Sequence, residues 1–326
     1  MDMSPNAGWL ALNKFPRLAA LVERAREMPA INAAVVHPCD AASLSGALEA
    51  RALGMIEPIL VGPKAKIVAT AESAGLSLDG LALEDAPHSH AAAERAVDLV
   101  RSGRCQAIMK GSLHTDEVMA AIVRDTLGLK TERRISHIFV IDAPLYDKLI
   151  LVSDAAVNIA PDLLAKRDIV QNAIDLARAI GIATPKVAIL SALETVTPKI
   201  PSTVEAAALC KMADRGQISG GLLDGPLAFD NAISIDAVAA KGIVSDVAGQ
   251  ADVLIVPDLE AGNILAKQLV FLAGAEDGGL VLGARCPVML TSRADSPAAR
   301  IASAALAQLY VYWAEKQAAA KLAAGE

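Results

Sequence analysis

The hydrophobic residues of this 326-residue chain recur in a two-part unit. A short β-branched or aliphatic run ends in a turn with Gly, Pro or Asp, and an amphipathic segment of roughly 10 to 15 residues follows. The runs predict strands at 32–38, 57–62, 106–111, 136–144, 149–155, 186–192, 220–226, 252–257, 279–284 and 287–292. The segments between them predict helices around 41–53, 90–102, 115–127, 166–180, 203–214, 261–273 and 297–315. This βα alternation is typical of an α/β protein with largely parallel strands.

The alternation breaks at 136–155 and at 279–292, where consecutive apolar runs are separated only by short turns. Each break indicates a hairpin or a crossing between lobes. The chain is longer than a typical single core supports, so we expect two domains of roughly 150 residues each, with a cleft. We expect the first lobe to comprise residues 1–148 with 293–326, and the second to comprise residues 149–292.

Composition narrows the class of protein. Hydrophobic residues make up 54% of the chain and aromatic residues only 3%, which suits parallel strands that are buried on both faces. The formal net charge of -7 argues against a nucleic-acid partner, because affinity for a phosphate backbone requires clustered Lys and Arg. The charge does not exclude small anionic ligands, since an acidic protein can contain a locally positive cleft.

The cysteines, the histidines and the first residues predict a cytoplasmic protein without a bound metal or a membrane segment. Cys39, Cys105, Cys210 and Cys286 are far apart, unlike the ligands of a zinc site or the cysteines of a disulfide scaffold. The five histidines are scattered as well. The start of the chain carries Asp2 and no basic region ahead of a long apolar run, unlike a signal peptide. All apolar runs are far shorter than the ~18 residues that span a bilayer.

Small or polar residues follow several of the predicted strands. In an open α/β sheet the ligand binds beyond the carboxyl ends of the strands, so we expect these residues to assemble one cleft. They are Lys110–Ser112, Asp154 and Asn158, Asp224 and Gly225, Pro257–Asn263, and Ser292–Ser296.

The candidate chemistry depends on arginine, serine and carboxylate side chains. The sequence lacks GxSxG, GxxxxGK[ST] and a GxGxxG that opens a helix after a strand, which weighs against a common nucleoside-triphosphate enzyme or a standard NAD domain. Arg133 and Arg134 precede a predicted strand, and an arginine fork matches the oxygens of a phosphate or acyl phosphate. The alternative is that both arginines belong to a solvated rim.

Two further segments allow both a ligand-binding and a capping interpretation. At the end of the strand at 106–111, Lys110, Ser112 and His114 precede a helix whose N–H groups could bind an anion, but residues 115–117 are also consistent with ordinary helix capping. In 257–263, Asp258 and Glu260 could cap the helix, but Gly262 and Asn263 in its first turn also suit a nearby bulky ligand.

The turn at 292–297 contains more polar groups than capping requires. Ser296 before Pro297 is a typical N-cap with proline at the first helical position. That interpretation leaves Ser292, Arg293 and Asp295 unexplained.

Taken together, the motifs resemble the phosphate acyltransferase family, which comprises phosphate acetyltransferases and phosphate butyryltransferases, and the butyryl type looks closer. The resemblance spans roughly residues 30 to 312. The motifs that carry it are MKGSLHTDE (109–117), TERRISH (131–137), DAAVNIAPDL (154–163), RDIVQNAIDLA (167–177), SALETVTPKIPSTVEAAALCKMADRGQI (191–218), DGPLAFDNAIS (224–234), ADVLIVPDLEAGN (251–263) and LTSRADS (290–296).

The resemblance implies two α/β lobes around a cleft, similar in fold to the isocitrate and isopropylmalate dehydrogenases. It implies the reaction acyl-CoA plus phosphate to acyl phosphate plus CoA, by direct transfer in a ternary complex, in at least a homodimer. Coenzyme A is then a substrate, and no cofactor is bound. Ser292 matches the serine that contacts the CoA thiol, and Arg293 matches the arginine at the phosphate. We expect the substrates to contact Lys110, Ser112, His114, Arg133, Arg134, Asp224, Pro226, Glu260, Asn263 and Lys267.

The sequence departs from the acetyl type at two positions. The aspartate proposed there as thiol base, seven residues after the serine, is Ala299 in this chain, and Asp295 is the nearest replacement. The acetyl type also has an arginine at the position that Met119 occupies in this chain, and we assign the phosphate-binding role of that arginine to Arg133.

Two alternative functions stay open. They are a metal- and NAD-dependent hydroxyacid dehydrogenase of similar fold, and a non-catalytic relative that binds CoA or acyl phosphate. Acyl-chain length depends on pocket shape, which residue types do not reveal.

Overall fold

The computed structural model describes residues 7–291 and 295–324, and the chain divides into two compact units. Unit 1 comprises Met1–Arg133 with Glu276–Glu326, and unit 2 comprises Arg134–Ala275. These boundaries differ from the expected ones at 148/149 and 292/293. The reason is strand pairing: the predicted break at 136–155 is an antiparallel hairpin that lies wholly in unit 2, whereas the break at 279–292 is an antiparallel pair that joins unit 1.

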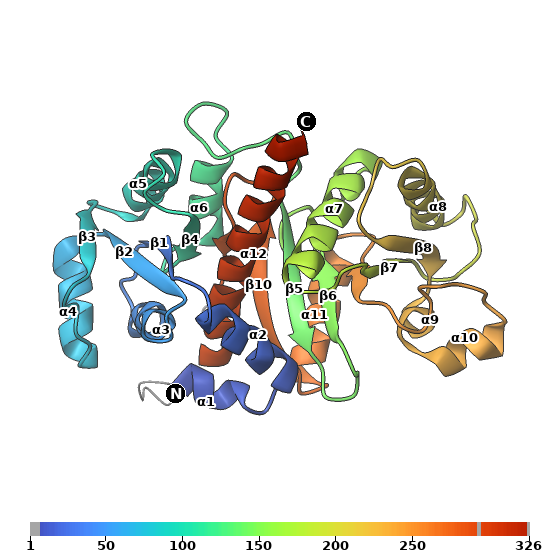
Figure 1. Cartoon of the computed structure of the whole chain (residues 1–326), viewed down its shortest axis with the longest axis horizontal. Helices are drawn as coiled ribbons and strands as arrows, with labels where there is room; N and C mark the ends of the chain where they lie inside the picture. The colour runs from blue at the N-terminus through green and yellow to red at the C-terminus, as the bar shows by residue number, and fades with distance from the viewer. Residues whose placement is uncertain (1–6, 292–294, 325–326) are drawn as a thin grey trace. The chain divides into compact units, whose positions relative to one another are not determined.

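Unit 1 is a six-stranded sheet with helices on both faces (Figure 1). The strand order is β3(Ala82–Asp85), β2(Ile56–Gly62), β1(Ile31–Val36), β4(Ala107–Lys110), β11(Val288–Met289) and β10(Glu276–Leu282). All neighbouring pairs are parallel except β11 with β10. The helices are α1(Ala7–Leu12), α2(Pro16–Arg26), α3(Ala41–Ala52), α4(Lys64–Ala74), α5(Ser89–Arg101), α6(Thr115–Ile122) and α12(Pro297–Ala324).

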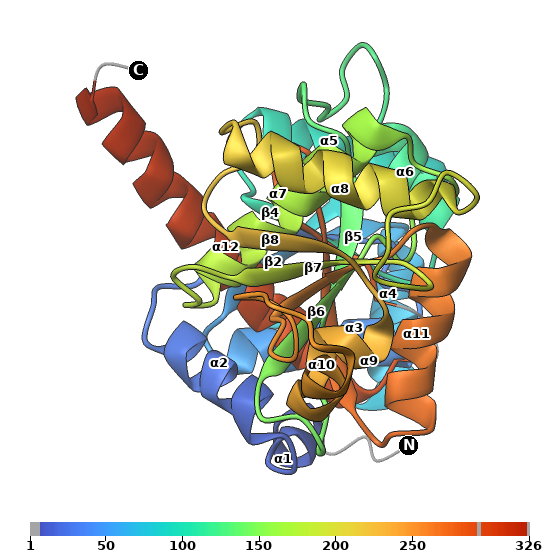
Figure 2. The ribbon, with the colours of Figure 1, turned by 90° about the vertical axis from the view of Figure 1, so that its right-hand side faces the viewer.

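Aliphatic runs bury the central strands of unit 1. In β1 only the second residue, Asn32, is exposed, and α5 packs against this strand. The long helix α12 packs along β10, where Gly278 allows the approach: a Cβ atom there would lie 2.8 Å from the Ala302 side chain. The carboxyl-terminal turns of α12 extend away from the sheet and are exposed (Figure 2).

Unit 2 has a five-stranded sheet in the order β5(Ser136–Asp142), β6(Leu149–Ser153), β9(Val253–Ile255), β7(Lys186–Leu190) and β8(Leu222–Leu227). Helices α7(Leu163–Ala179) and α8(Pro201–Asp214) cover one face, and α9(Phe229–Ile233), α10(Ile235–Lys241) and α11(Leu259–Phe271) lie on the other (Figure 2). Strands β6, β9, β7 and β8 are parallel. Their carboxyl ends therefore lie at one edge, as the pattern predicts.

Several elements escape the sequence pattern for physical reasons. Strand β3 is a short edge strand, ALED, with only partly buried or exposed residues, so it lacks an apolar run. Helices α9 and α10 are too short to show a helical period. Helix α12 continues to residue 324, past its expected end at 315, through an exposed alanine-rich stretch of high helix propensity. Across the described ranges, no helix is both long enough and apolar enough to cross a bilayer.

Candidate active site

The carboxyl ends of β1, β4 and β11 bring several predicted residues together in unit 1. Lys110 is only 5% exposed, and its Nζ donates to the carbonyl of Thr291 at 3.3 Å and to the carbonyl of Gly111 at 3.5 Å. Lys110 therefore lies beside the segment that leads into the SRADS turn. Ser292 and Arg293 themselves lie outside the described residues.

Ser112 and Gly111 join the end of β4 to the end of β1. The Ser112 hydroxyl donates to the carbonyl of His37 at 2.8 Å and accepts from the Cys39 N–H at 3.1 Å. A Cβ atom on Gly111 would lie 2.3 Å from the carbonyl oxygen of Val36. A glycine is thus required at position 111 by contact between neighbouring strands.

His114 has the capping environment that the alternative interpretation predicts. Its backbone N–H donates to the Glu117 carboxylate at 3.0 Å, at the first turn of α6. Glu117 also accepts from the Ser89 hydroxyl at 2.8 Å. The His114 side chain is exposed, and its contact with substrate stays a prediction.

Asp295 adjoins two carboxyl groups of β10 that the sequence reasoning missed. The Ser296 hydroxyl donates to Glu276 at 2.9 Å and accepts from the Ala299 N–H at 2.9 Å, so Ser296 caps α12 as predicted. Burial, together with the charges of Asp295 and Glu276, raises the pKa of Asp277 to about 7. Burial likewise raises the pKa of Glu276. An acidic cluster therefore lies beside the described end of the turn.

In unit 2, the cluster after β6 is built around Asp154, which is 3% exposed. Its carboxylate accepts from the backbone N–H groups of His137, Ala156, Val157 and Asn158 at 2.9 to 3.2 Å. Such a carboxylate is fully engaged in holding its own loop. Asp154 is therefore a structural residue and not an acid or base.

Arg133 and Arg134 occupy different surroundings. In unit 1, the Arg133 N–H donates to the hydroxyl of Thr131 at 3.1 Å, and that hydroxyl donates to the carbonyl of Gly283. In unit 2, Arg134 donates from Nε to the Asn158 side-chain oxygen at 2.7 Å. The Arg134 side chain is thus anchored on Asn158, a residue of the predicted strand-end cluster.

The first turn of α11 combines capping with contact to the Asp154 loop. Asp258 is the N-cap and accepts from the Ala261 N–H at 2.9 Å. The Asn263 side chain donates to the carbonyl of Ala155 at 3.2 Å. Glu260 and Lys267 are exposed on the same helix.

The remaining predicted residues are at β8. Asp224 is half-buried and accepts from the N–H of Gly225 at 2.8 Å, whereas Pro226 is buried. Asp224 is therefore the more accessible of the two to a substrate.

His137 is buried in β5 with its ring against Phe139. Burial lowers the pKa of His137 to about 4, which keeps the imidazole neutral at physiological pH.

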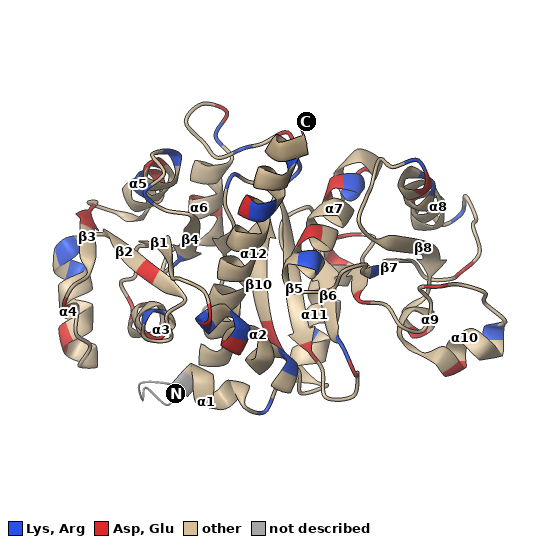
Figure 3. Cartoon of the chain, in the orientation of Figure 1, with Lys and Arg blue, Asp and Glu red and all other residues tan. Residues whose placement is uncertain are grey.

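Within the described part of the chain, no group of three or more His, Cys, Asp or Glu side chains could hold a metal ion. Basic and acidic residues are interspersed along helices such as α5 and α7 (Figure 3). These helices therefore do not form a continuous basic surface, and binding of an anion there would depend on individual side chains.

Comparison with known proteins identifies similar sequences and folds. Residues 88–308 match the family model described as "Phosphate acetyl/butaryl transferase". A phosphate acetyltransferase of Rhizobium meliloti is 59% identical over 96% of this chain and 97% of its own. A phosphate butyryltransferase of Clostridium acetobutylicum is 39% identical over 88% of this chain and 94% of its own. These identities do not favour the butyryl type over the acetyl type.

Solved structures bear out the fold prediction. A branched-chain phosphotransacylase from Enterococcus faecalis superposes with a TM-score of 0.75 at 30% identity, covering 86% of this chain and 99% of its own. A 4-hydroxythreonine-4-phosphate dehydrogenase from Klebsiella pneumoniae, at 12% identity, gives a TM-score of 0.51 over 86% of this chain and 99% of its own. The second likeness concerns the fold alone, and confirms its dehydrogenase-like character.

Proposed function

The chain belongs to the phosphate acetyl/butyryl transferase family, and from this premise we propose that it transfers acetyl groups between coenzyme A and phosphate by direct attack. The reversible transfer of a short acyl group between CoA and phosphate is the activity of the family. The proposal of acetyl rests on one observation, the 59% identity to a phosphate acetyltransferase over nearly the whole chain. Membership makes the protein an acyltransferase rather than a hydroxyacid dehydrogenase.

The reaction requires the thiol of CoA to lose its proton as sulfur attacks the acyl carbonyl carbon. The new C–S bond forms, the C–O bond to phosphate breaks, and phosphate leaves with the electron pair. A thiol of pKa about 8.5 is a few per cent ionised at neutral pH, so a carboxylate base contributes roughly 10²-fold. We assign this base to Asp295. Its acidic neighbours Glu276 and Asp277 support the assignment, since clusters of interacting carboxyl groups with perturbed pKa values are typical of functional sites.

Cationic groups stabilise the departing phosphate. We assign Ser292 to the CoA thiol and Arg293 to the phosphate, as the family motif implies. Lys110, tied to the carbonyl of Thr291 just before these residues, supports this assignment. Removal of one such cation costs on the order of 10² to 10³ in turnover.

The test measures thiol release from acetyl-CoA, propionyl-CoA and butyryl-CoA in the presence of phosphate. We expect acetyl-CoA to give the highest kcat/KM, and Arg293→Ala and Asp295→Asn to lower turnover without a matching loss of stability. Near-normal acyl-phosphate formation by both variants would refute the assignment of this turn. A preference for butyryl-CoA would refute the proposed acyl group but not the reaction.

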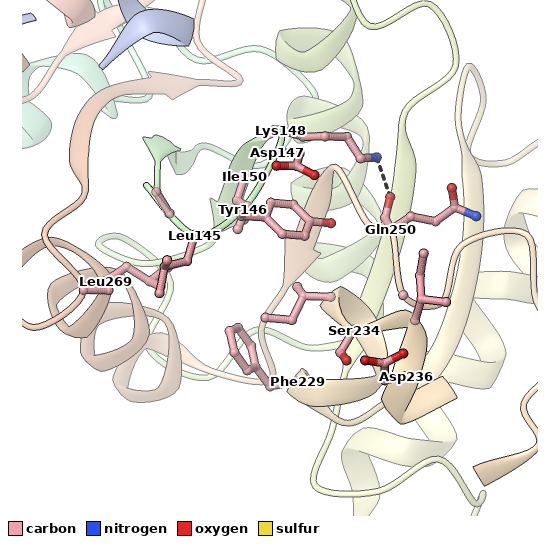
Figure 4. A pocket seen from close by; sticks show the side chains of 15 residues that line it. Leu145, Tyr146, Asp147, Lys148, Ile150, Phe229, Ser234, Asp236, Gln250 and Leu269 are labelled. Carbon is pink, nitrogen blue, oxygen red and sulfur yellow. Dashed lines mark hydrogen bonds between the residues drawn. The ribbon is translucent and has the colours of Figure 1, made fainter. Parts of the chain in front are cut away.

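We also propose a cytoplasmic homodimer. The free thiols of Cys39, Cys105, Cys210 and Cys286 support a reducing compartment. The support for a dimer is an apolar surface on unit 2, around a cavity of about 660 Å³ between the β5–β6 turn, α9, α10 and α11 (Figure 4). Exposed hydrophobic patches of this kind mark interaction sites. The exposed apolar side chains at or next to this cavity are Leu145 (94% exposed), Phe229, Ile235, Phe271 and Leu272.

The proposed interface is tested by light scattering after size-exclusion chromatography. We expect a dimer whose association is weakened by Leu145→Asp. The control is Leu322→Asp, an equally apolar and highly exposed position near the end of α12 in unit 1. A monomeric parent protein, or a dimer weakened only by the control substitution, would refute this interface.

A further inference from the structure

The hydrogen bonds around the start of β5 give two buried residues a role that their motif does not reveal. We propose that Asp154 and Asn158 position the Arg134 guanidinium to bind a phosphate group of a substrate. This inference rests on the proposed function, because it needs a phosphate-bearing substrate. All three residues belong to unit 2.

Asp154 fixes the loop. Besides the four backbone N–H groups described above, its carboxylate accepts from the side-chain Nδ2 of Asn158. Five donors on two oxygens compensate the burial of the charge. The loop at 154–158 is thereby held in one conformation, and the Asn158 side chain with it.

Asn158 is 4% exposed and can present only one atom to Arg134. Its Nδ2 donates to the Asp154 carboxylate and, at 2.8 Å, to the carbonyl of Ile135. Because both of these partners are acceptors, the NH₂ group must face them and the side-chain oxygen must face the other way. That oxygen accepts from Nε of Arg134 at 2.7 Å. The network therefore fixes the orientation of the amide as well as its position.

The backbone of Arg134 is anchored independently. Its N–H donates to the Asp168 carboxylate at 2.9 Å, and its carbonyl accepts from Nδ2 of Asn172 at 2.9 Å. Asp168 is ion-paired with Arg167 at 2.8 Å. Both ends of the Arg134 side chain are thus held, while the residue itself is exposed.

The anchor of the guanidinium is a neutral amide, so it orients the cation without neutralising it. Among the described residues, no carboxylate forms an ion pair with the Arg134 side chain. With Nε donated to Asn158, the two terminal nitrogens keep the paired N–H geometry that matches two oxygens of a phosphate. An arginine with a fixed direction also loses less conformational entropy on binding than a free one.

The same loop supports a second predicted contact. Asn263 donates to the carbonyl of Ala155, and a Cβ atom on Gly262 would lie 2.6 Å from the carbonyl oxygen of Asp154. The first turn of α11 and Arg134 are consequently held by one rigid segment. The phosphate group could come from the reacting phosphate or acyl phosphate, or from coenzyme A.

The experiment is a double-mutant cycle on the full chain with Arg134→Ala and Asn158→Ala, measuring kcat and KM for acetyl phosphate, CoA and dephospho-CoA. Charge-assisted hydrogen bonds of this kind predict a KM raised on the order of 10-fold to 100-fold by Arg134→Ala. We expect about a 10-fold effect from Asn158→Ala, and no further effect when it is added to Arg134→Ala. A rise for acetyl phosphate identifies the reacting phosphate, and a rise for CoA but not dephospho-CoA identifies the 3′-phosphate of CoA. A rise for both forms of CoA identifies its pyrophosphate.

The controls separate positioning from stability. Arg215→Ala removes an exposed arginine of unit 2 and should leave KM unchanged. Asn231→Ala removes a fully buried amide of the same unit, and it should lower the melting temperature without changing KM. Arg134 is exposed, so its variants test the proposal even where Asn158→Ala fails to fold. KM values within twofold for Arg134→Ala, or additive effects in the cycle, would overturn the inference. An inactive parent protein would instead refute the proposed function.

Discussion

The acidic cluster on β10 predicts that one substitution will stabilise the protein in a pH-dependent way. The change is Asp277→Asn, which keeps the size of the side chain and removes its charge. Burial and the carboxylates of Asp295 and Glu276 raise the pKa of Asp277 from 3.8 to about 7. In the unfolded chain the Asp277 carboxyl ionises at its ordinary pKa. Between pH 3.8 and about 7, therefore, the folded state binds more protons than the unfolded state.

The sign follows from proton linkage. Because the unfolded state has released the proton while the folded state still holds it, the free energy of unfolding falls as pH rises from about 4 to about 7. One pH unit is worth 1.36 kcal/mol, so the full penalty is about 4 kcal/mol above pH 7. The amide must still be accommodated beside two carboxylates. We therefore expect Asp277→Asn to add about 2 to 4 kcal/mol at pH 8 and almost nothing near pH 4.

Urea unfolding of the parent and the variant at pH 4, 6 and 8 measures this difference. The control is Asp125→Asn, because the ion pair with Lys130 lowers the pKa of Asp125. Loss of that charge should not stabilise the protein at any of these pH values. If Asp277→Asn were equally stabilising at all three, or destabilising at pH 8, the burial and charge repulsion assigned to Asp277 would be wrong.

Three further predictions concern backbone contact, capping and thiol reactivity. Gly111→Ala should destabilise unit 1 by about 3 kcal/mol or more, measured by unfolding, because its Cβ would overlap the carbonyl of Val36; an unchanged stability would refute the strand contact. Asp258→Ala should cost about 0.5 to 2 kcal/mol by loss of the α11 N-cap, and Asp258→Ser should restore most of it. Burial raises the pKa of Cys105 to about 11 and that of Cys286 to about 12, so iodoacetamide at pH 8 should leave both unmodified in the native protein, as mass spectrometry can determine.

The apolar runs predicted the central strands because those strands need no information from elsewhere in the chain. A run such as the one at β1 is buried by helices that any α/β arrangement supplies. The edge strand β3 differs, since its pairing with β2 rather than its composition makes it a strand. The unit boundaries differ from the expected domain boundaries for a similar reason, because pairing of β11 with β4 joins the segment at 276–291 to unit 1.

Family motifs located the candidate site, but they could not divide its residues into those that bind and those that support. Gly111, Ser112 and Asp154 all stand at strand ends, as predicted, yet their contacts in the structure are with the protein's own backbone. Asp277 was missed altogether. An acidic residue at the start of a strand looks like a solvated end in sequence, and only the antiparallel return of β10 brings it beside Asp295.

The neighbouring arginines show where sequence reasoning reaches its limit. Arg133 and Arg134 have the same side chain and the same motif, and an isolated sequence gives no reason to rank them. For Arg134 the structure adds Asn158, which follows a different strand and is itself fixed by Asp154. A buried amide that has used both of its N–H groups must offer its oxygen, and in the described part of the chain that oxygen accepts from Nε of Arg134. The direction of the Arg134 side chain therefore depends on the hydrogen bonds of a neutral neighbour from another strand end, and the double-mutant cycle tests that dependence.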